Sequence, residues 1–391
     1  MKIENRLLAI LIGFLLCQAL MANNLIDRFR VPIKLYSSSS FGYDNNVFRL
    51  SDLERNQEYS NSKDINIINS RTFDGAYISP KISIKYAPHI IDQFKTEFKF
   101  AFNRNVYMSI PEKSYSVINS ELGIKLGSYR WIRFSHRYLP RYYLKNYKDR
   151  DYSLNDYYEC LFSSESFKIS YSHPINRKIW SRVKYSKINM YYNDHFTEYD
   201  IVSNEIEARL YFKMRGFDSN FAYSYSASSN ILDDINSESS NSDRSYKTHV
   251  YGLSTKKKIR KISYVDNFGI SLIVKNRIYE DLWPEDDFEY IDFDSDYVEG
   301  TELSGSVSDP LHYGRQDVEY NFSIWLSNKI NKTFSHEVRL KYRWKDVHSE
   351  FMVNYINGMS DVEEVLINDL KEFNKFEIIY KITYNMNLDI L

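Results

Sequence analysis

The carboxyl-terminal stretch Tyr380-Lys-Ile-Thr-Tyr-Asn-Met-Asn-Leu-Asp-Ile390 decides the expected fold, because apolar and polar residues alternate along it without a break. A β-strand sends every second side chain to the same face, so this stretch has one apolar and one polar face. The pattern recurs along the chain, whose 391 residues include 35 Tyr and 24 Phe. A soluble sandwich would bury its apolar faces in a core. The aromatic surplus and a mean hydropathy of -0.51 instead favour a transmembrane β-barrel, with apolar residues outside and polar residues inside.

Residues 1–22 are expected to form a signal peptide. Lys2 and Arg6 precede a short apolar run from Leu7 to Leu16, and Ala22 is the expected last residue before cleavage. The run is too short for a membrane-spanning helix. Residues 23–391 would then form the barrel domain.

Cysteine usage adds little to this interpretation. Cys17 is an alternative lipid-attachment site, but the residues before it are large and apolar rather than small. Cleavage after residue 22 would leave Cys160 as the only cysteine, which rules out an intramolecular disulfide.

Period-two alternation predicts an all-β, antiparallel, up-and-down barrel of about fourteen strands. The expected strands are 31–43, 73–87, 93–107, 115–127, 130–144, 156–172, 179–193, 199–213, 217–229, 245–257, 263–279, 313–327, 333–347 and 374–391. Short and long connections alternate, as in outer-membrane barrels with tight periplasmic turns and longer outside loops. A phase change at Ser163-Ser164 predicts a bulge in 156–172. Helical spacing of apolar residues predicts a short amphipathic helix within 359–373.

The segment Phe41-Gly-Tyr-Asp-Asn-Asn-Val-Phe48 resembles the opening of several porin-like families among bacterial outer-membrane β-barrel proteins. The resemblance implies the outer membrane of a Gram-negative-type bacterium, with membrane lipid and the barrel-assembly machinery as partners. The chain departs from the usual pattern at its end, because many such barrels finish on Phe or Trp and this one finishes on Leu391.

Strand phasing predicts a basic lumen, in which basic residues outnumber acidic ones by about two to one. The residues expected to set selectivity are Lys95, Lys99, Lys125, Arg133, Arg137, Arg182, Lys184, Arg209, Arg277, Arg339, Lys341 and Arg343. Such a channel would concentrate anions and repel cations. The alternative is a ladder of cross-strand ion pairs that fills the barrel, and Trp325 adds bulk that favours a constriction.

The loop 280–312 is strongly acidic. Asp292, Asp294 and Asp296 have the alternating spacing with which a calcium-binding loop begins. Tyr297 and Leu303 depart from that motif, so a solvated acidic loop is the alternative. We expect no other cofactor.

No enzymatic activity is expected. His136, His173 and His336 each follow a Ser, but adjacent strand residues point to opposite faces and cannot form a dyad. The net charge of -1 argues against nucleic acid as a partner. The sequence therefore predicts a passive, porin-like channel for small polar or anionic solutes. The alternative is a non-conducting surface barrel that acts in adhesion, scaffolding or partner binding through its long loops.

Overall fold

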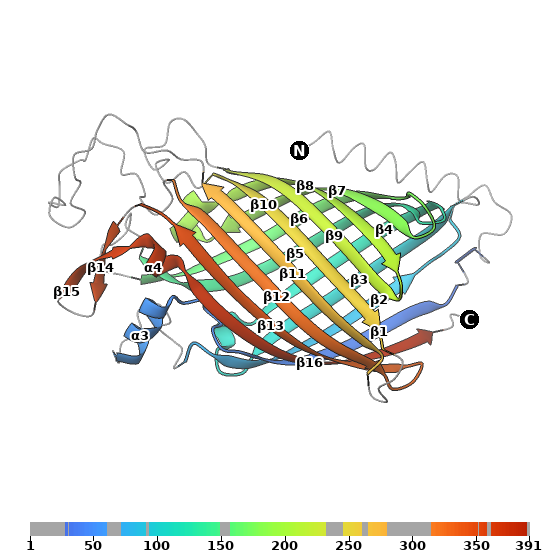
Figure 1. Ribbon diagram of the computed structural model, residues 1–391, viewed down its shortest axis with the longest axis horizontal. Helices are drawn as coiled ribbons and strands as arrows, with labels where there is room; N and C mark the ends of the chain where they lie inside the picture. Colours follow the sequence, from blue (N-terminus) through green and yellow to red (C-terminus); the bar gives the residue numbers. More distant parts are fainter. Residues whose placement is uncertain are drawn as a thin grey trace.

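The computed structural model is a single closed barrel of fourteen antiparallel strands (Figure 1). It describes residues 28–29, 31–60, 72–90, 94–148, 157–231, 245–259, 265–279, 314–350, 352–357 and 361–388. The predicted signal peptide and the predicted calcium ligands Asp292, Asp294 and Asp296 lie outside these residues. Among the helices that are described, none is long and apolar enough to cross a membrane.

The barrel strands follow the predicted order and agree with the predicted ranges to within a few residues. They are β1 (Ile33–Asp44), β2 (Gly75–Tyr86), β3 (Lys95–Tyr107), β4 (Tyr115–Gly127), β5 (Arg130–Lys148), β6 (Tyr157–Pro174), β7 (Ile179–Tyr192), β8 (Ile201–Met214), β9 (Phe217–Asn230), β10 (Tyr246–Lys258), β11 (Asn267–Tyr279), β12 (Gln316–Lys329), β13 (Phe334–His348) and β16 (Phe373–Leu388). The predicted all-β, up-and-down barrel is confirmed.

The first and last strands close the barrel. Ile33 of β1 lies opposite Leu388 of β16, and this register continues to Asp44 opposite Glu377. Every barrel strand is therefore paired on both sides, which leaves no open edge for pairing with another chain.

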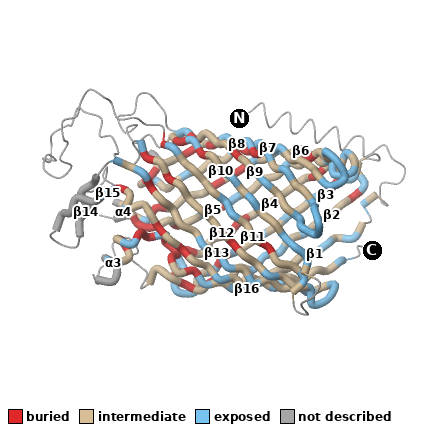
Figure 2. The backbone as a smooth tube through the Cα atoms, in the orientation of Figure 1, coloured by how far each residue is buried: buried red, intermediate tan, exposed pale blue. Residues whose placement is uncertain are grey.

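The two faces of the wall differ as the alternation predicts, and exposed and half-buried residues follow one another along the strands (Figure 2). On β13, Leu340 and Tyr342 point outward and are each 43% exposed, while Lys341 between them points inward and is half-buried. The same outward apolar exposure recurs on other strands, as in Phe98, Phe100, Phe167, Ile206, Phe221, Leu253 and Tyr380. The exterior is therefore an apolar surface and the lumen a polar one.

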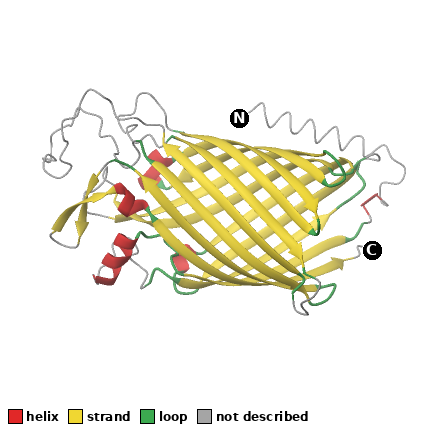
Figure 3. Ribbon diagram, in the orientation of Figure 1, coloured by secondary structure: helices red, strands yellow, loops and turns green. Residues whose placement is uncertain are grey.

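The connections also differ between the two ends (Figure 3). The ends of β1 and β16 nearest the chain termini lie at what we call the short-turn end. At the opposite, long-loop end lie α3 (Asp52–Ser60), α4 (Ile367–Lys371) and the hairpin of β14 (Met352–Asn357) and β15 (Asp361–Leu366). The short 3-10 helices η1 (Pro111–Lys113) and η2 (Asp194–Tyr199) lie in connections at this end.

Two local predictions are wrong. The helix expected within 359–373 covers only α4, because Asp361–Leu366 forms a strand that pairs with Met352–Asn357. The bulge expected at Ser163-Ser164 lies on the neighbouring strand. The β5–β6 register shifts between Leu139 and Tyr142, so the extra residue belongs to β5, next to Pro140, which has no N–H to donate.

Candidate functional site

The predicted selectivity residues all lie at lumen-facing positions. They are Lys95 and Lys99 on β3, Lys125 on β4, Arg133 and Arg137 on β5, Arg182 and Lys184 on β7, Arg209 on β8, Arg277 on β11, and Arg339, Lys341 and Arg343 on β13. Each alternates with an outward residue on its own strand, so the period of the strand places it inside.

Carboxylates neutralise many of these bases. Glu207 lies 2.9 Å from the Lys184 ammonium, 3.4 Å from Arg182 and 3.1 Å from Arg209. Comparable ion pairs involve Lys99, Arg133, Arg339, Lys341 and Arg343. The ion-pair ladder considered from the sequence is thus present along much of the wall, where it stiffens neighbouring strands.

Four of the predicted residues have no ion-pair partner in the part of the chain that the structure describes: Lys95, Lys125, Arg137 and Arg277. Lys95 and Lys125 lie opposite each other near the short-turn end. No carboxylate of the described residues forms an ion pair with these four side chains, so they are candidates for attracting anions.

The segment that follows β1 folds into the long-loop end of the barrel, which we call the mouth. Val47, Phe48 and Leu50 are buried there against Ile110 and Tyr143. Burial of these apolar side chains holds the segment in place, because exposing them again would cost hydrophobic free energy.

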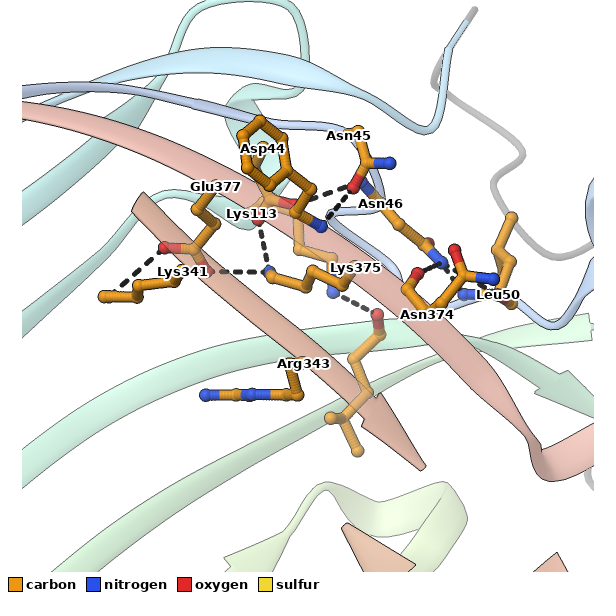
Figure 4. A network of polar contacts seen from close by, with 12 residues as sticks. Asp44, Asn45, Asn46, Leu50, Lys113, Lys341, Arg343, Asn374, Lys375 and Glu377 are labelled. Carbon is orange, nitrogen blue, oxygen red and sulfur yellow. Dashed lines mark hydrogen bonds and ion pairs between the residues drawn. The ribbon is translucent and has the colours of Figure 1, made fainter. Parts of the chain in front are cut away.

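A polar network fastens this segment to the last strand (Figure 4). The Asn45 amide N–H donates to the Phe376 carbonyl at 3.1 Å, and the Phe376 N–H donates to Asn45 Oδ1 at 2.6 Å. The Lys375 ammonium forms an ion pair with Asp44 and a second one with Glu377 at 3.3 Å. These contacts extend the pairing of the first and last strands beyond Asp44.

Asn46 fixes the turn that follows. Its Nδ2 donates to the carbonyls of Leu50 at 2.8 Å and Asn374 at 3.0 Å, while its Oδ1 accepts from the Leu50 N–H at 2.8 Å. The turn places Arg49 at φ 57°, in the left-handed region that residues other than Gly, Asn and Asp seldom adopt. Arg49 is exposed, although the residues on either side of it are buried.

The Arg49 side chain lies near the last strand. Its guanidinium carbon lies 5.9 Å from the ring centre of Phe373 on β16.

Lys113 in η1 is a functional candidate that the sequence did not indicate. It is 3% exposed, and its ammonium donates to the carbonyls of Tyr143 at 3.0 Å and Leu144 and lies 4.6 Å from the ring centre of Phe48. Burial, reinforced by Arg49, holds the pKa of Lys113 well below its ordinary value. This lysine ties η1 and β5 to the inserted segment.

A capping box at the start of α3, which the sequence could have predicted, also connects this helix to the barrel. The Ser51 hydroxyl accepts from the Glu54 N–H at 3.1 Å, and Glu54 accepts from the Ser51 N–H at 2.9 Å. This is a capping box, recognisable from Ser and Glu three residues apart. The second Glu54 oxygen pairs with the buried ammonium of Lys145 on β5.

Neither a catalytic dyad nor a metal site appears among the described residues. The Nε2 of His136 lies 2.8 Å from Glu165, at outward positions on β5 and β6. No group of three or more His, Cys, Asp or Glu side chains is arranged there to hold a metal ion.

No protein-family model matches the chain, and no curated protein matches it either. Among solved structures it is similar to an anion-selective porin from Comamonas acidovorans (6% identity, TM-score 0.41, covering 90% of this chain and 98% of that one). It is also similar to a bacterial polysaccharide outer membrane secretin (9%, 0.39, covering 92% and 99%) and to the outer membrane protein OprD from Pseudomonas aeruginosa (8%, 0.35, covering 92% and 94%). At these values the similarities identify no family, and the fold rests on the strand pairing itself.

Proposed function

We propose that this protein is a passive channel for small anionic or polar solutes. The observation that supports it is the lumen wall, where basic side chains outnumber carboxylates and several bases have no ion-pair partner among the described residues. A confined, positively charged passage raises the local concentration of anions and lowers that of cations.

We place this channel in the outer membrane. The exterior carries a band of exposed apolar and aromatic side chains, which hydrocarbon solvates better than water does. If the protein lies in the outer membrane, membrane lipid and the barrel-assembly machinery are its expected partners. Residues 1–22 would then be removed as a signal peptide. Calcium binding at Asp292, Asp294 and Asp296 stays a separate prediction.

Single-channel recording of the refolded mature protein in a planar bilayer tests the proposal. Under a KCl gradient, we expect steady conductance. The reversal potential should lie closer to the equilibrium potential of chloride than to that of potassium. Replacing both Lys95 and Lys125 by Gln should move the reversal potential toward zero. A reversal potential closer to the equilibrium potential of potassium in the unmodified protein would refute the anion preference.

A second candidate function is surface binding through the long loops. It is favoured by the apolar cluster of Val47, Phe48 and Leu50, which fills part of the mouth. A folded, heat-modifiable barrel that never conducts would support this candidate and refute the channel.

A further inference from the structure

A cavity of about 550 Å³ lies at the long-loop end of the barrel, where α3 and α4 meet the ends of β13 and β16 (Figure 1). The two helices contact each other, and α4 also contacts β13. The volume is within the range of about 300–1,000 Å³ that is common for sites of small ligands. This end of the barrel therefore has room for a small molecule outside the set of predicted selectivity residues.

Contacts between distant parts of the chain hold the walls of this cavity in place. Arg55 of α3 donates to Asn374 Oδ1 at the start of β16, at 3.3 Å. Glu372, directly after α4, accepts from the Val347 N–H of β13 at 3.1 Å. Ile367 of α4 is fully buried. Both helices are thus joined to the strands, and the cavity has its shape before any ligand arrives.

One wall of the cavity is aromatic. Tyr342 and Trp344 occupy outward positions on β13, and their ring centres are 5.4 Å apart. Tyr320 of β12 stacks on the indole from one side at 4.6 Å, whereas the cavity lies on the other side, toward Asn374 of β16. The half-buried indole therefore offers ring surface to the cavity, and Trp is the aromatic side chain that attracts cations most strongly.

The same cavity is acidic. The carboxylates that line it are Asp52, Asp346, Asp369 and Glu372. Lys345 is the single cation among the described lining residues, and its ammonium pairs with Asp317 at 3.5 Å. Asp52 pairs with Arg55 within α3, but Asp346 and Asp369 form no ion pair with any described residue. The cavity therefore carries net negative charge beside its aromatic wall.

This combination suits an organic cation better than a metal ion. No three carboxylates converge among the described residues in the way that a metal site requires. An ammonium group, in contrast, is attracted both by the face of an aromatic ring and by carboxylates at a distance. Aromatic rings alone are ordinary on the exterior of a membrane barrel, but contact with lipid tails gives no reason for carboxylates around the same cavity.

We propose that this cavity binds a small ammonium group. The rings of Trp344 and Tyr342 contact the cation, and Asp346 and Asp369 supply the opposing charge. A free solute and the headgroup of a membrane lipid can both carry such a group. The site uses none of the predicted selectivity residues, so the inference goes beyond the proposed channel function and does not depend on it.

NMR titrations that follow the ligand signals, with the refolded mature protein in an uncharged detergent, test the proposal. The probes are choline, ethanolamine and 3,3-dimethylbutan-1-ol, which is the uncharged carbon analogue of choline. We expect choline and ethanolamine to bind with dissociation constants on the order of 1 mM, and the analogue to bind at least about tenfold more weakly. Equal binding of choline and its analogue would overturn the proposal, as would complete displacement of choline by an equal concentration of calcium chloride.

Variants assign the binding to this cavity. Trp344→Leu should weaken choline binding at least about tenfold, and Trp344→Phe should retain part of it. The double variant Asp346→Asn, Asp369→Asn keeps the rings and should also weaken binding. Asp194→Asn removes an exposed carboxylate from η2, at the same end of the barrel but outside the cavity, and should leave binding unchanged. Unchanged choline binding in heat-modifiable Trp344→Leu and double-variant proteins would refute the assignment.

Nanodiscs distinguish the two sources of the ammonium group. In nanodiscs of digalactosyl diacylglycerol, which is uncharged, free choline should bind as it does in detergent. If phosphatidylcholine nanodiscs weaken this binding several-fold, the lipid headgroup occupies the cavity, whereas unchanged binding assigns the cavity to free solutes.

Two outcomes separate this inference from the channel function. Anion-selective conductance without binding of choline or ethanolamine would overturn the ammonium site and leave the channel intact. Choline binding by a folded protein that never conducts would support the site and refute the channel.

Discussion

The indole of Trp325 lies directly over Gly269 on the neighbouring strand, so that a Cβ at residue 269 would come within 2.1 Å of the ring. The two residues face each other across the β11–β12 register. The Arg339 guanidinium stacks on the indole at 4.6 Å. Trp325 therefore packs along the wall of the barrel. The sequence predicted that its bulk would narrow the lumen, but the indole instead contacts the adjacent strand.

Gly269→Ala should displace this indole. The added methyl forces Trp325 off the wall, and overpacking of this kind costs roughly 1–3 kcal/mol. We expect a lower midpoint of chemical denaturation and a smaller single-channel conductance, because the displaced ring enters the lumen.

Gly252→Ala is the matched control. Gly252 also faces the lumen on β10, but a Cβ there would meet only the Ala222 methyl at an ordinary 3.7 Å. Conductance and stability should stay close to those of the unmodified protein. Equal effects of the two substitutions would contradict the packing assigned to Trp325.

Asn46→Ala should release the turn that carries Arg49. The substitution leaves the buried N–H and carbonyl of Leu50 without the Asn46 side chain, which costs roughly 1–3 kcal/mol. We expect reduced stability in denaturant and increased current noise, because Arg49 loses its fixed position.

Asn331→Ala provides the comparison for this prediction. Asn331 also accepts from two backbone N–H groups, those of Thr333 and Phe334, but it lies in an exposed turn between β12 and β13. Its removal should leave the current noise unchanged. If noise rose equally in both variants, the role given to Asn46 would be wrong.

Glu207→Gln should make the lumen more anion-selective. The change leaves Arg182, Lys184 and Arg209 without their shared carboxylate, and loss of charged hydrogen bonds costs roughly 1.5–3 kcal/mol. Under a KCl gradient, the reversal potential should shift toward the equilibrium potential of chloride. The midpoint of chemical denaturation should fall. Glu337→Gln, which affects only the pair with Arg339, should produce smaller changes in both. An unchanged reversal potential after loss of Glu207 would mean that these bases do not face the permeating ions.

Anion preference should increase between pH 8 and pH 6. Lys371 of α4 keeps some contact with solvent, but the surrounding protein and the cations of Lys145 and Arg315 lower its pKa to about 7, against the opposing effect of Glu54. Below that pH the ammonium adds positive charge at the mouth. The unfolded chain binds this proton up to about pH 10.4, so the contribution of Lys371 to stability rises with pH above 7.

Reversal potentials of the unmodified protein and of Lys371→Met at both pH values test this prediction. The substitution should reduce the pH dependence, since the Lys371 ammonium is no longer there to titrate. A pH dependence of the same size in Lys371→Met would show that another group is responsible.

The β14–β15 hairpin shows that the spacing of apolar residues alone can predict the wrong secondary structure. Val362, Val365, Leu366 and Leu370 have helical spacing, yet Asp361–Leu366 is extended because its backbone pairs with Met352–Asn357. Helix and strand patterns overlap in so short a stretch, and a non-local pairing decides between them. The bulge on β5 has the same cause, because a bulge is a property of two paired strands rather than of one.

The sequence by itself determined the order of the strands, the barrel class and the face on which each lumen residue lies. These follow from a two-residue period, which is a local property of the extended backbone. The tertiary structure alone decided which side chains meet inside the barrel: Asn46 and Lys375 join the mouth segment to β16, Trp325 lies on Gly269, and Arg49 lies over the ring of Phe373. Each of these contacts joins residues that are distant in the chain, and only closure of the barrel brings them together.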